Sequence, residues 1–586
     1  MQALRQAVPR YAVVLLATLA ICAPLSLIAY QSLLSAPFFS PSRTVGLDSF
    51  RFIFDDPDLW KALRTSLLLA VGLCAIAVPL GGVLAFLMQR TDMPGRRWIE
   101  PLILVPVFVS PMVLGFGYIV AAGPVGFFSQ LAEGVFGFVP WNVYTLPAII
   151  VIAGLTHIPH AYLYISAALR NMGSDVEEAA RVAGASPWRL MWTVSLPLVR
   201  PAVLYALVLL FLLGLEVFGL VLVLGDSTGH LVMATYIYKL TNKLGTPAYH
   251  LMAAVAVVLI AMTVPLVALQ RGLTGYAQRF VTLKGKGMRS RPLPLGPWRW
   301  VAFATVMLWL FVAAVVPLSG ILLRAFVTHW GQGVALADAF SLEAFRHIGD
   351  QANLVRAIVN SIAIGVVGGA AAIGCYAALG LAMHGKADGT TRFLDYLVMA
   401  PRAVPGLLIG LAFLWVFLFF PLWLDNALDD GWLSTLWCAA WLRDNLVEWL
   451  RALRSTIFSV WLAYTVVWVA YGLRLISSTL LQIAPELKEA ARVTGATSGQ
   501  VTRHVTLPLA RSGLIGAWLL IFLIFEREYS TGVYLLSTGT ETIGSMLVSL
   551  WAAGDIDIVA ALSCINVVLV VAGLALALRL GVKLRD

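Results

Sequence analysis

The sequence is poor in charged residues and in cysteine. Of its 586 residues only 12% are charged, while 60% are hydrophobic. A soluble domain carries roughly 25% charged residues, so an ordinary soluble globular protein is excluded. The 5 cysteines are scattered without disulfide or metal-ligand spacing, so we expect small apolar residues and no metal site. They are Cys22, Cys74, Cys375, Cys438 and Cys564.

Long apolar runs take the place of the missing charge. About twelve runs of roughly 20 residues, each enough to cross a bilayer core, follow one another along the chain. They are continuously apolar rather than alternating, which favours helices over a barrel. We therefore predict an all-α polytopic membrane protein with about 12 transmembrane helices. The first run, from Tyr11 to about Leu34, lacks a persuasive cleavage site and is interpreted as a retained helix.

The net charge of +10 is distributed by loop. Arg96, Arg97 and the segment 271–299 fall on one side of the predicted membrane, whereas Asp55 and Asp56 fall on the other. This is the positive-inside pattern, which sets topology and does not imply nucleic acid. It predicts cytoplasmic N- and C-termini and no nucleic-acid partner.

The spans form two similar halves. Residues 273–297 are basic and rich in Gly and Pro, and they predict a cytoplasmic linker between a first half, 1–272, and a second half, 298–586. Each half holds six predicted spans, and Ser66 opens the second span as Ser361 opens the eighth. Two copies in the same orientation imply a pseudo-twofold axis along the membrane normal, with a pathway between the halves.

A polar segment occurs in both halves with one register. Residues 178–197 and 489–508 align without a gap, because 489−178 and 508−197 both equal 311. Each copy predicts a short helix, a turn at a glycine and a second short helix. In the second copy Pro485 suits the first helical position. An even number of spans before each copy places both on the cytoplasmic side.

This doubled segment resembles the EAA loop of permeases of binding-protein-dependent ABC importers. The resemblance covers essentially the whole chain and implies two coupling loops, 174–198 and 485–509, that dock on an ABC ATPase dimer. It also implies an external solute-binding protein as partner and a place in the bacterial inner membrane. The coupling residues implied by the motif are Glu178, Ala179, Ala180, Gly184, Leu196, Pro197, Glu489, Ala490, Ala491, Gly495, Leu507 and Pro508.

ATP chemistry is expected in another chain. The sequence holds no G-x-x-x-x-G-K-[ST] phosphate loop. We expect a transport subunit that is not an enzyme, without a cofactor of its own, driven by ATP that the partner subunit uses.

Ionisable residues inside predicted spans are candidates for the translocation pathway. An insertion cost of roughly 3 kcal/mol makes each a functional candidate. Glu216 lies in the fifth span, and the cluster Glu526–Arg527–Glu528 lies at the matching end of the eleventh. The alternative is that this cluster pairs locally near the outer end. His157 and His160 are interpreted as ordinary hydrogen-bonded helix residues rather than metal ligands.

The solute is less well specified. The stretches 215–226 and 526–536 are most similar to the ferric-iron import group, with thiamine, phosphonate and polyamine importers as relatives. A secondary transporter of the major facilitator type is one rival, because loop 91–97 resembles its D-x-x-G-R-R element. That rival leaves the doubled segment unexplained. An integral membrane enzyme would need a polar catalytic cluster that the sequence does not offer.

Overall fold

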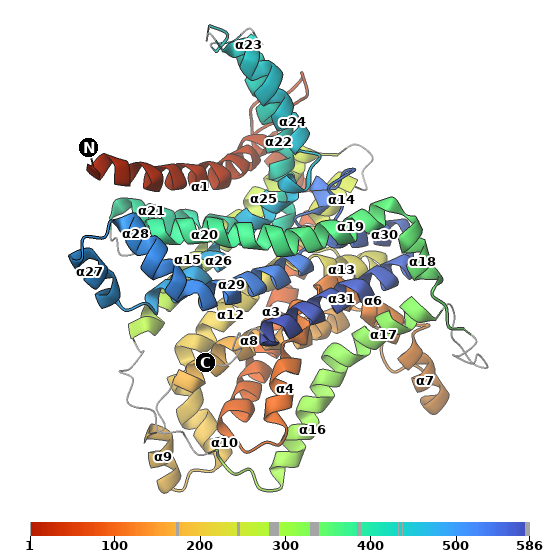
Figure 1. Cartoon of the computed structure of the whole chain (residues 1–586). Coiled ribbons are helices and arrows are strands. Elements are labelled where there is room, and N and C mark those ends of the chain that lie inside the picture. The colour runs from red at the N-terminus through yellow and green to blue at the C-terminus, as the bar shows by residue number, and fades with distance from the viewer. Residues whose placement is uncertain are drawn as a thin grey trace. The chain divides into compact units, whose positions relative to one another are not determined.

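The structure is a computed structural model that describes residues 2–171, 175–242, 247–279, 292–327, 339–383, 388–429, 431, 433–435 and 438–579. Throughout these ranges the regular elements are helices, joined by three isolated bridges, Leu34–Val45, Thr91–Leu293 and Val327–Phe340. Ten helices are long and apolar enough to cross a membrane, or up to twelve if each of two bent pairs is one span. The predicted all-α membrane fold with about twelve spans is confirmed (Figure 1).

The chain forms two compact units, which we name by the half that supplies most of each. The first-half unit comprises residues 35–37 and 46–342. Its elements are α2 (Asp48–Asp55), α3 (Pro57–Arg90), α4 (Arg96–Ile103), α5 (Val105–Phe108), α6 (Pro111–Ala122), α7 (Phe127–Phe136), α8 (Leu146–Asn171), α9 (Asp175–Val182), α10 (Pro187–Leu190), η1 (Met191–Ser195), α11 (Leu196–Leu198), α12 (Arg200–Leu215), α13 (Gly219–Leu224), η2 (Asp226–Thr228), α14 (Met233–Asn242), α15 (Tyr249–Arg279), α16 (Trp298–Leu310), η3 (Phe311–Val315) and α17 (Val316–Phe326). Its centre is α3, which packs against α8 and α12.

The second-half unit comprises residues 1–34, 38–45 and 343–586. Its elements are α1 (Gln2–Ser32), α18 (Glu343–Asp350), α19 (Ala352–Ala363), η4 (Ile364–Gly368), α20 (Gly369–Met383), α21 (Gly389–Leu397), η5 (Ala400–Ala403), α22 (Gly406–Asp429), α23 (Ala439–Trp441), η6 (Leu442–Val447), α24 (Glu448–Leu453), α25 (Ile457–Val467), α26 (Val469–Leu481), α27 (Pro485–Val493), α28 (Ser498–Val501), η7 (Thr502–Thr506), α29 (Leu507–Arg527), η8 (Val533–Leu535), α30 (Ile543–Ala553) and α31 (Ile556–Arg579). Here α29 packs against α20, α26 and α31.

The first span of each sequence half belongs to the other unit. Helix α1 packs against α20 and α22, and Arg10 forms an ion pair of 2.7 Å with Asp388. Hydrogen bonds from Arg10 and Thr391 hold the pKa of Asp388 well below its usual range. Reciprocally, Tyr118 of α6 donates a hydrogen bond of 2.7 Å to the carbonyl of Val312 in η3. The boundaries 1–272 and 298–586 thus mark the sequence halves, while the packing units exchange their first helices.

Matching hydrogen bonds support the two-copy architecture. Ser66 in α3 accepts a hydrogen bond of 2.8 Å from the N–H of Met233, which opens α14. Ser361 in α19 accepts one of 2.9 Å from the N–H of Ile543, which opens α30. The interval between the two donors is 310 (543−233), so one residue is lost between the doubled segment and this point. Ser66 and Ser361, which correspond in sequence, therefore have the same structural role in the two halves.

One bend distinguishes the halves after the doubled segment. In the first half Trp188–Leu198 and Arg200–Leu215 meet at 75°, whereas Gly499–Arg527 is continuous in the second. Pro201 has no N–H to donate to the preceding turn, so it stands in the first turn of α12 and the helix breaks just before it, at Val199. The residue 311 positions later is Ser512, which does not impose this restriction.

Residues 280–291 of the predicted linker 273–297 lie outside the described residues, which resume at 292. Its end is held in the first-half unit. The N–H of Leu293 donates to the carbonyl of Arg90 at 2.8 Å, and the N–H of Leu295 donates to the Asp92 carboxylate at 2.8 Å. The last residues of the linker thus have a fixed place beside the end of α3.

Candidate functional site

The first copy of the doubled segment forms the expected helix–turn–helix. Helix α9 ends in a turn at Gly184, whose φ is +83°. The N–H of Ala185 donates to the carbonyl of Ala180 at 3.0 Å, the bond that closes a Schellman cap. Ser186 then caps α10 by accepting from the N–H of Arg189 at 3.3 Å. A Cβ at Gly184 would meet nothing within 4 Å, so its backbone conformation alone favours glycine.

The second copy repeats this geometry in the other unit. Helix α27 begins at Pro485, as expected, and ends at Val493, and the turn that follows it contains Gly495, whose φ is +89°. The N–H of Ala496 donates to the carbonyl of Ala491 at 3.1 Å, again closing the cap. Thr497 stands where the first copy has Ser186 (497−186 is 311) and accepts from the N–H of Gln500 at 3.4 Å. The π-helical turns η1 and η7 that follow begin 311 residues apart, at Met191 and Thr502.

The two first helices present the residues that the motif implies. Glu178, Ala179, Glu489 and Ala490 are exposed, as are both turn glycines, while Ala180 and Ala491 are half-buried. Leu196 and Pro197 begin α11, and Leu507 and Pro508 begin α29, so the Leu-Pro ending opens the next span in both copies. The motif residues of each copy therefore lie on one continuous segment at the end of the helical bundle of their unit.

Each copy also exposes a valine that the sequence interpretation missed. Val182 is 91% exposed and Val493 is 87% exposed, and the two are 311 residues apart. They close the shared string E-A-A-R-V, so the same position-by-position comparison that selected Glu178 would have found them. An exposed apolar side chain therefore stands at the same point of both copies.

Glu216 and the cluster at 526–528 correspond in place but differ in environment. Glu216 is half-buried and caps the end of α12 with its N–H bonded to the carbonyl of Leu212 at 3.1 Å. By the interval of 311 that relates the doubled segments, Glu216 corresponds to Arg527, one residue from Glu526 and from Glu528. Helix α29 ends at Arg527, so the three residues of the cluster divide between the helix and the turn after it.

Glu528 is a structural anchor of that turn. Its Oε1 accepts hydrogen bonds from the N–H groups of Ser530 and Thr531, both at 3.1 Å, and from both hydroxyls. Its Oε2 accepts from Trp468 Nε1 at 3.1 Å. The Arg527 guanidinium stands 5.8 Å from the centre of the Trp468 ring. For Glu528 the local-pairing alternative describes what the side chain does here.

Glu526 has the opposite surroundings. It is 3% exposed, and within the described residues neither carboxylate oxygen has a hydrogen-bond partner. Its main-chain carbonyl accepts from Asn566 of α31 at 3.0 Å. A Cβ at Gly365 in η4 would lie 2.8 Å from Oε1 of Glu526, so the glycine makes room for the carboxylate. A buried acid in such a niche is a functional candidate.

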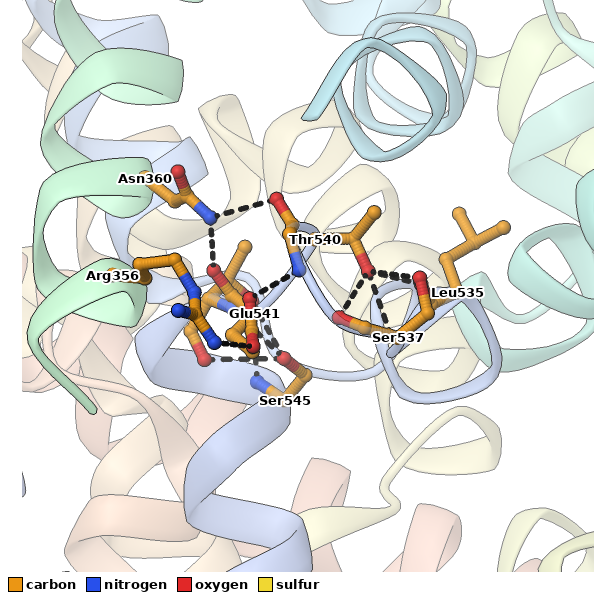
Figure 2. A network of polar contacts seen from close by, with 9 residues as sticks. Arg356, Asn360, Leu535, Ser537, Thr540, Glu541 and Ser545 are labelled. Atoms are coloured by element: carbon orange, nitrogen blue, oxygen red, sulfur yellow. Dashed lines mark hydrogen bonds and ion pairs between the residues drawn. The ribbon is translucent and has the colours of Figure 1, made fainter. Parts of the chain in front are cut away.

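A second polar network holds the loop before α30 (Figure 2). Arg356 of α19 donates to the Glu541 carboxylate at 2.9 Å, and the amide of Asn360 donates to the carbonyls of Gly539 and Glu541 at 3.1 and 2.9 Å. Burial opposes ionisation of Glu541, but the hydrogen bonds from Arg356 and from the Gly539 N–H outweigh it and lower its pKa. Sequence reasoning missed this network, since its members lie far apart in the chain.

His157 and His160 both lie in α8. His157 Nδ1 lies 2.7 Å from the carbonyl of Ala153, one helical turn earlier, and the rings of His157 and His160 stack at 5.4 Å. A search of the described residues finds no group of three or more His, Cys, Asp or Glu side chains that could hold a metal ion.

The chain is similar in sequence to known transport permeases, in one case over most of its length. A relative from Haemophilus influenzae, "Fe(3+)-transport system permease protein FbpB 2", is 23% identical over 501 residues, covering 85% of this chain and 86% of that protein. "Molybdenum transport system permease protein ModB" of Escherichia coli is 29% identical over 167 residues, covering 28% of this chain and 72% of that protein. A solved bacterial ABC transporter involved in import of alginate aligns at a TM-score of 0.35 and 19% identity, covering 43% of this chain and 88% of that one.

Two segments, residues 77–276 and 370–586, each match the family described as "Binding-protein-dependent transport system inner membrane component". One lies in each sequence half. Together they include both copies of the doubled segment, Glu216 and the cluster 526–528. Two matches over most of a multi-pass helical chain establish a permease, a transport subunit rather than a catalytic one. The chain belongs to this family of inner-membrane components of binding-protein-dependent ABC importers.

Proposed function

We propose that the chain is a fused permease with both halves in one polypeptide, which imports ferric iron and is driven by separate ATPase subunits. The observation that carries the coupling is the doubled exposed segment, with Glu178 and Val182 in one copy and Glu489 and Val493 in the other. Two equal loops suit the two equal faces of an ATPase dimer. The basic loops favour a cytoplasmic position for both loops and both termini.

Coupling would follow from a shift between two conformations. ATP binds and is hydrolysed in the partner subunits, and closure of that dimer moves the two docked loops together. The pathway between the halves then turns from inward to outward facing. Glu216, and Glu526 of the cluster that lies at the matching end of the eleventh span, are the residues we propose at this pathway.

Ferric iron is favoured by the extent of similarity. The iron permease of Haemophilus influenzae aligns over 85% of this chain, so the similarity extends through both sequence halves. A second candidate is an oxyanion, because ModB reaches 29% identity over a shorter region. "Sulfate permease 2, chloroplastic" of Chlamydomonas reinhardtii is also 29% identical, over 177 residues. Thiamine, phosphonate and polyamine remain alternatives from the resemblance.

Charge reversal tests the coupling. Glu178→Lys together with Glu489→Lys is expected to abolish co-purification with the ATPase subunits and ATP-driven uptake, while the protein still folds and inserts. Lys488→Glu is the matched control, because it changes charge beside Glu489 at a position where the first copy already has Glu177. An intact complex in the double variant, or an equal loss in the control, would refute the assignment.

Reconstitution tests the solute. Proteoliposomes with the permease, its ATPase subunits and its solute-binding protein are expected to accumulate labelled ferric iron and not molybdate or sulfate. Uptake of either oxyanion in preference to iron would overturn the iron proposal and leave the coupling proposal standing.

A further inference from the structure

The second half carries a helical return at the end of a membrane span. Helix α22 is continued by α23, η6 and α24, which run back beside it, and we call this part of α22 from Phe420 onward with those three elements the return hairpin (Figure 1). Leu428 of α22 is buried against Ala439 and Val447. The hairpin therefore has a small core of its own.

Ion pairs from two acids of α22, chiefly Asp425, fix its inner face. Arg443 Nε donates to Asp425 at 3.0 Å and also pairs with Asp429, and Arg451 pairs with the second oxygen of Asp425. Residues eight apart in a plain α-helix lie about 80° apart around the axis. The π-helical turn η6 between them takes up one residue and reduces this to about 20°. Both arginines therefore reach the same side.

The same geometry aligns two tryptophans on the opposite side. Trp441 and Trp449 are also eight apart, and each stands two residues before one of the arginines, about 200° around the helix. They are 63% and 57% exposed. The π-turn that brings both arginines to Asp425 thus also brings both indole rings to one outward face.

Helix α22 presents a second aromatic face. Trp423 stands two residues before Asp425 and so points away from the return, and its ring stacks with that of Phe420 at 6.1 Å. Trp423 is 53% exposed and Phe420 is 47% exposed. The two outer faces of the hairpin, opposite one another, both carry bare aromatic rings.

We propose that the return hairpin lies in the headgroup region of the leaflet at the end of α22, with the lipid surface as its partner. A protein would cover one face, whereas lipid surrounds the hairpin and meets both. Trp is concentrated at this depth of a bilayer. The 24 residues of α22 reach about 36 Å, several Å beyond a core of roughly 30 Å, so its aromatic end is already at the interface.

The hairpin would then fix the depth of α22. Because Arg443 binds Asp429 as well as Asp425 and Arg451 binds Asp425, the chain from η6 to α24 runs back toward the membrane. Trp449 therefore lies deeper than Trp441, by about 10 Å along the helix axis. This inference rests on α22 crossing the membrane and is independent of the coupling and solute proposals.

Depth-resolved quenching tests it. The full chain, with all five of its cysteines replaced by alanine, carries a single environment-sensitive label at Trp449→Cys or Trp441→Cys and is placed in nanodiscs of phosphatidylethanolamine and phosphatidylglycerol. Lipids spin-labelled near the headgroup are expected to quench the label at 449 strongly and that at 441 less, with iodide quenching both weakly. Val367→Cys, 68% exposed in η4 within a span, and Val493→Cys, on an exposed loop, calibrate lipid and water.

The decisive comparison is with the water control. If iodide quenches the labels at 441 and 449 as strongly as the label at 493, the proposal is overturned. The aromatic faces would then be a binding surface for a protein. A Trp441→Phe, Trp449→Phe chain with the label at Ser434 guards against disruption by cysteine. In that chain the label at Ser434 is expected to lie at the same depth as in a chain that keeps both tryptophans, since Phe preserves the apolar faces. Quenching of that label by iodide at the level of the 493 control would likewise count against it.

Discussion

The turn glycine of the second loop allows a clean test of the loop geometry. Gly495→Ala forces a Cβ into a conformation with φ of +89°, which costs roughly 1–2 kcal/mol for residues other than glycine. No atom lies within 4 Å of the added Cβ, so no clash contributes to this cost. Gly499→Ala is the matched control, because that exposed position also has open space but lies in α28, where alanine gains about 1 kcal/mol.

The expected consequence is a less populated turn. A cost of one to two kcal/mol lowers the ratio of formed to unformed turn by about 5- to 30-fold. If the ATPase binds only the formed turn, its apparent affinity falls by up to that factor. Hydrogen exchange of residues 485–506 reports the turn, and co-purification with the ATPase reports the docking. Equal behaviour of Gly495→Ala and Gly499→Ala in both assays would refute the reasoning.

Three further predictions concern the bundle. Ser66→Ala or Ser361→Ala leaves a buried helix-opening N–H without its acceptor and is expected to cost about 1–3 kcal/mol, seen as a lower melting temperature in detergent, with Thr193→Ala at an exposed position of η1 as control. Glu541→Gln is expected to destabilise at neutral pH; because the pKa of Glu541 is lowered, the difference from wild type is full above its ordinary value of about 4.3 and vanishes as pH falls through the lowered pKa. Glu526→Gln is expected to leave melting unchanged or raised while ATP-driven uptake falls, and a lower melting temperature with normal uptake would contradict a pathway role.

Local patterns in the sequence determined much of the fold. The spans follow from apolar length, and the loops follow from a helix start, a glycine and a Leu-Pro ending, which are all local signals. Gly184 and Gly495 adopt positive φ because their turns need it, as their spacing predicted. The correspondence of Ser66 with Ser361 could be seen in the sequence because a residue that recurs at the same place in both halves is less easily a coincidence than one seen once.

Long-range packing was not accessible in the same way. The exchange of α1 and α16 between the units depends on contacts such as Arg10 with Asp388, 378 residues apart, and no periodicity encodes them. The bend before α12 could have been predicted from the sequence, because Pro201 in the first half corresponds to Ser512 in the second. The network of Arg356 and Glu541 required the fold, since neither residue is unusual in its own segment.

The cluster at 526–528 shows why adjacency in sequence misleads. Glu526 and Glu528 look like one acidic group, yet α29 ends between them and sends their side chains to different surroundings. Both carboxylate oxygens of Glu528 accept hydrogen bonds, from Ser530, Thr531 and Trp468, so its removal would disrupt the turn. Glu526 is buried beside Gly365 and contributes no hydrogen bond from its carboxylate within the described residues. Burying an acid without a hydrogen bond costs free energy, and stability alone would favour an apolar residue there, which is the physical reason for proposing Glu526 rather than Glu528 as a pathway residue.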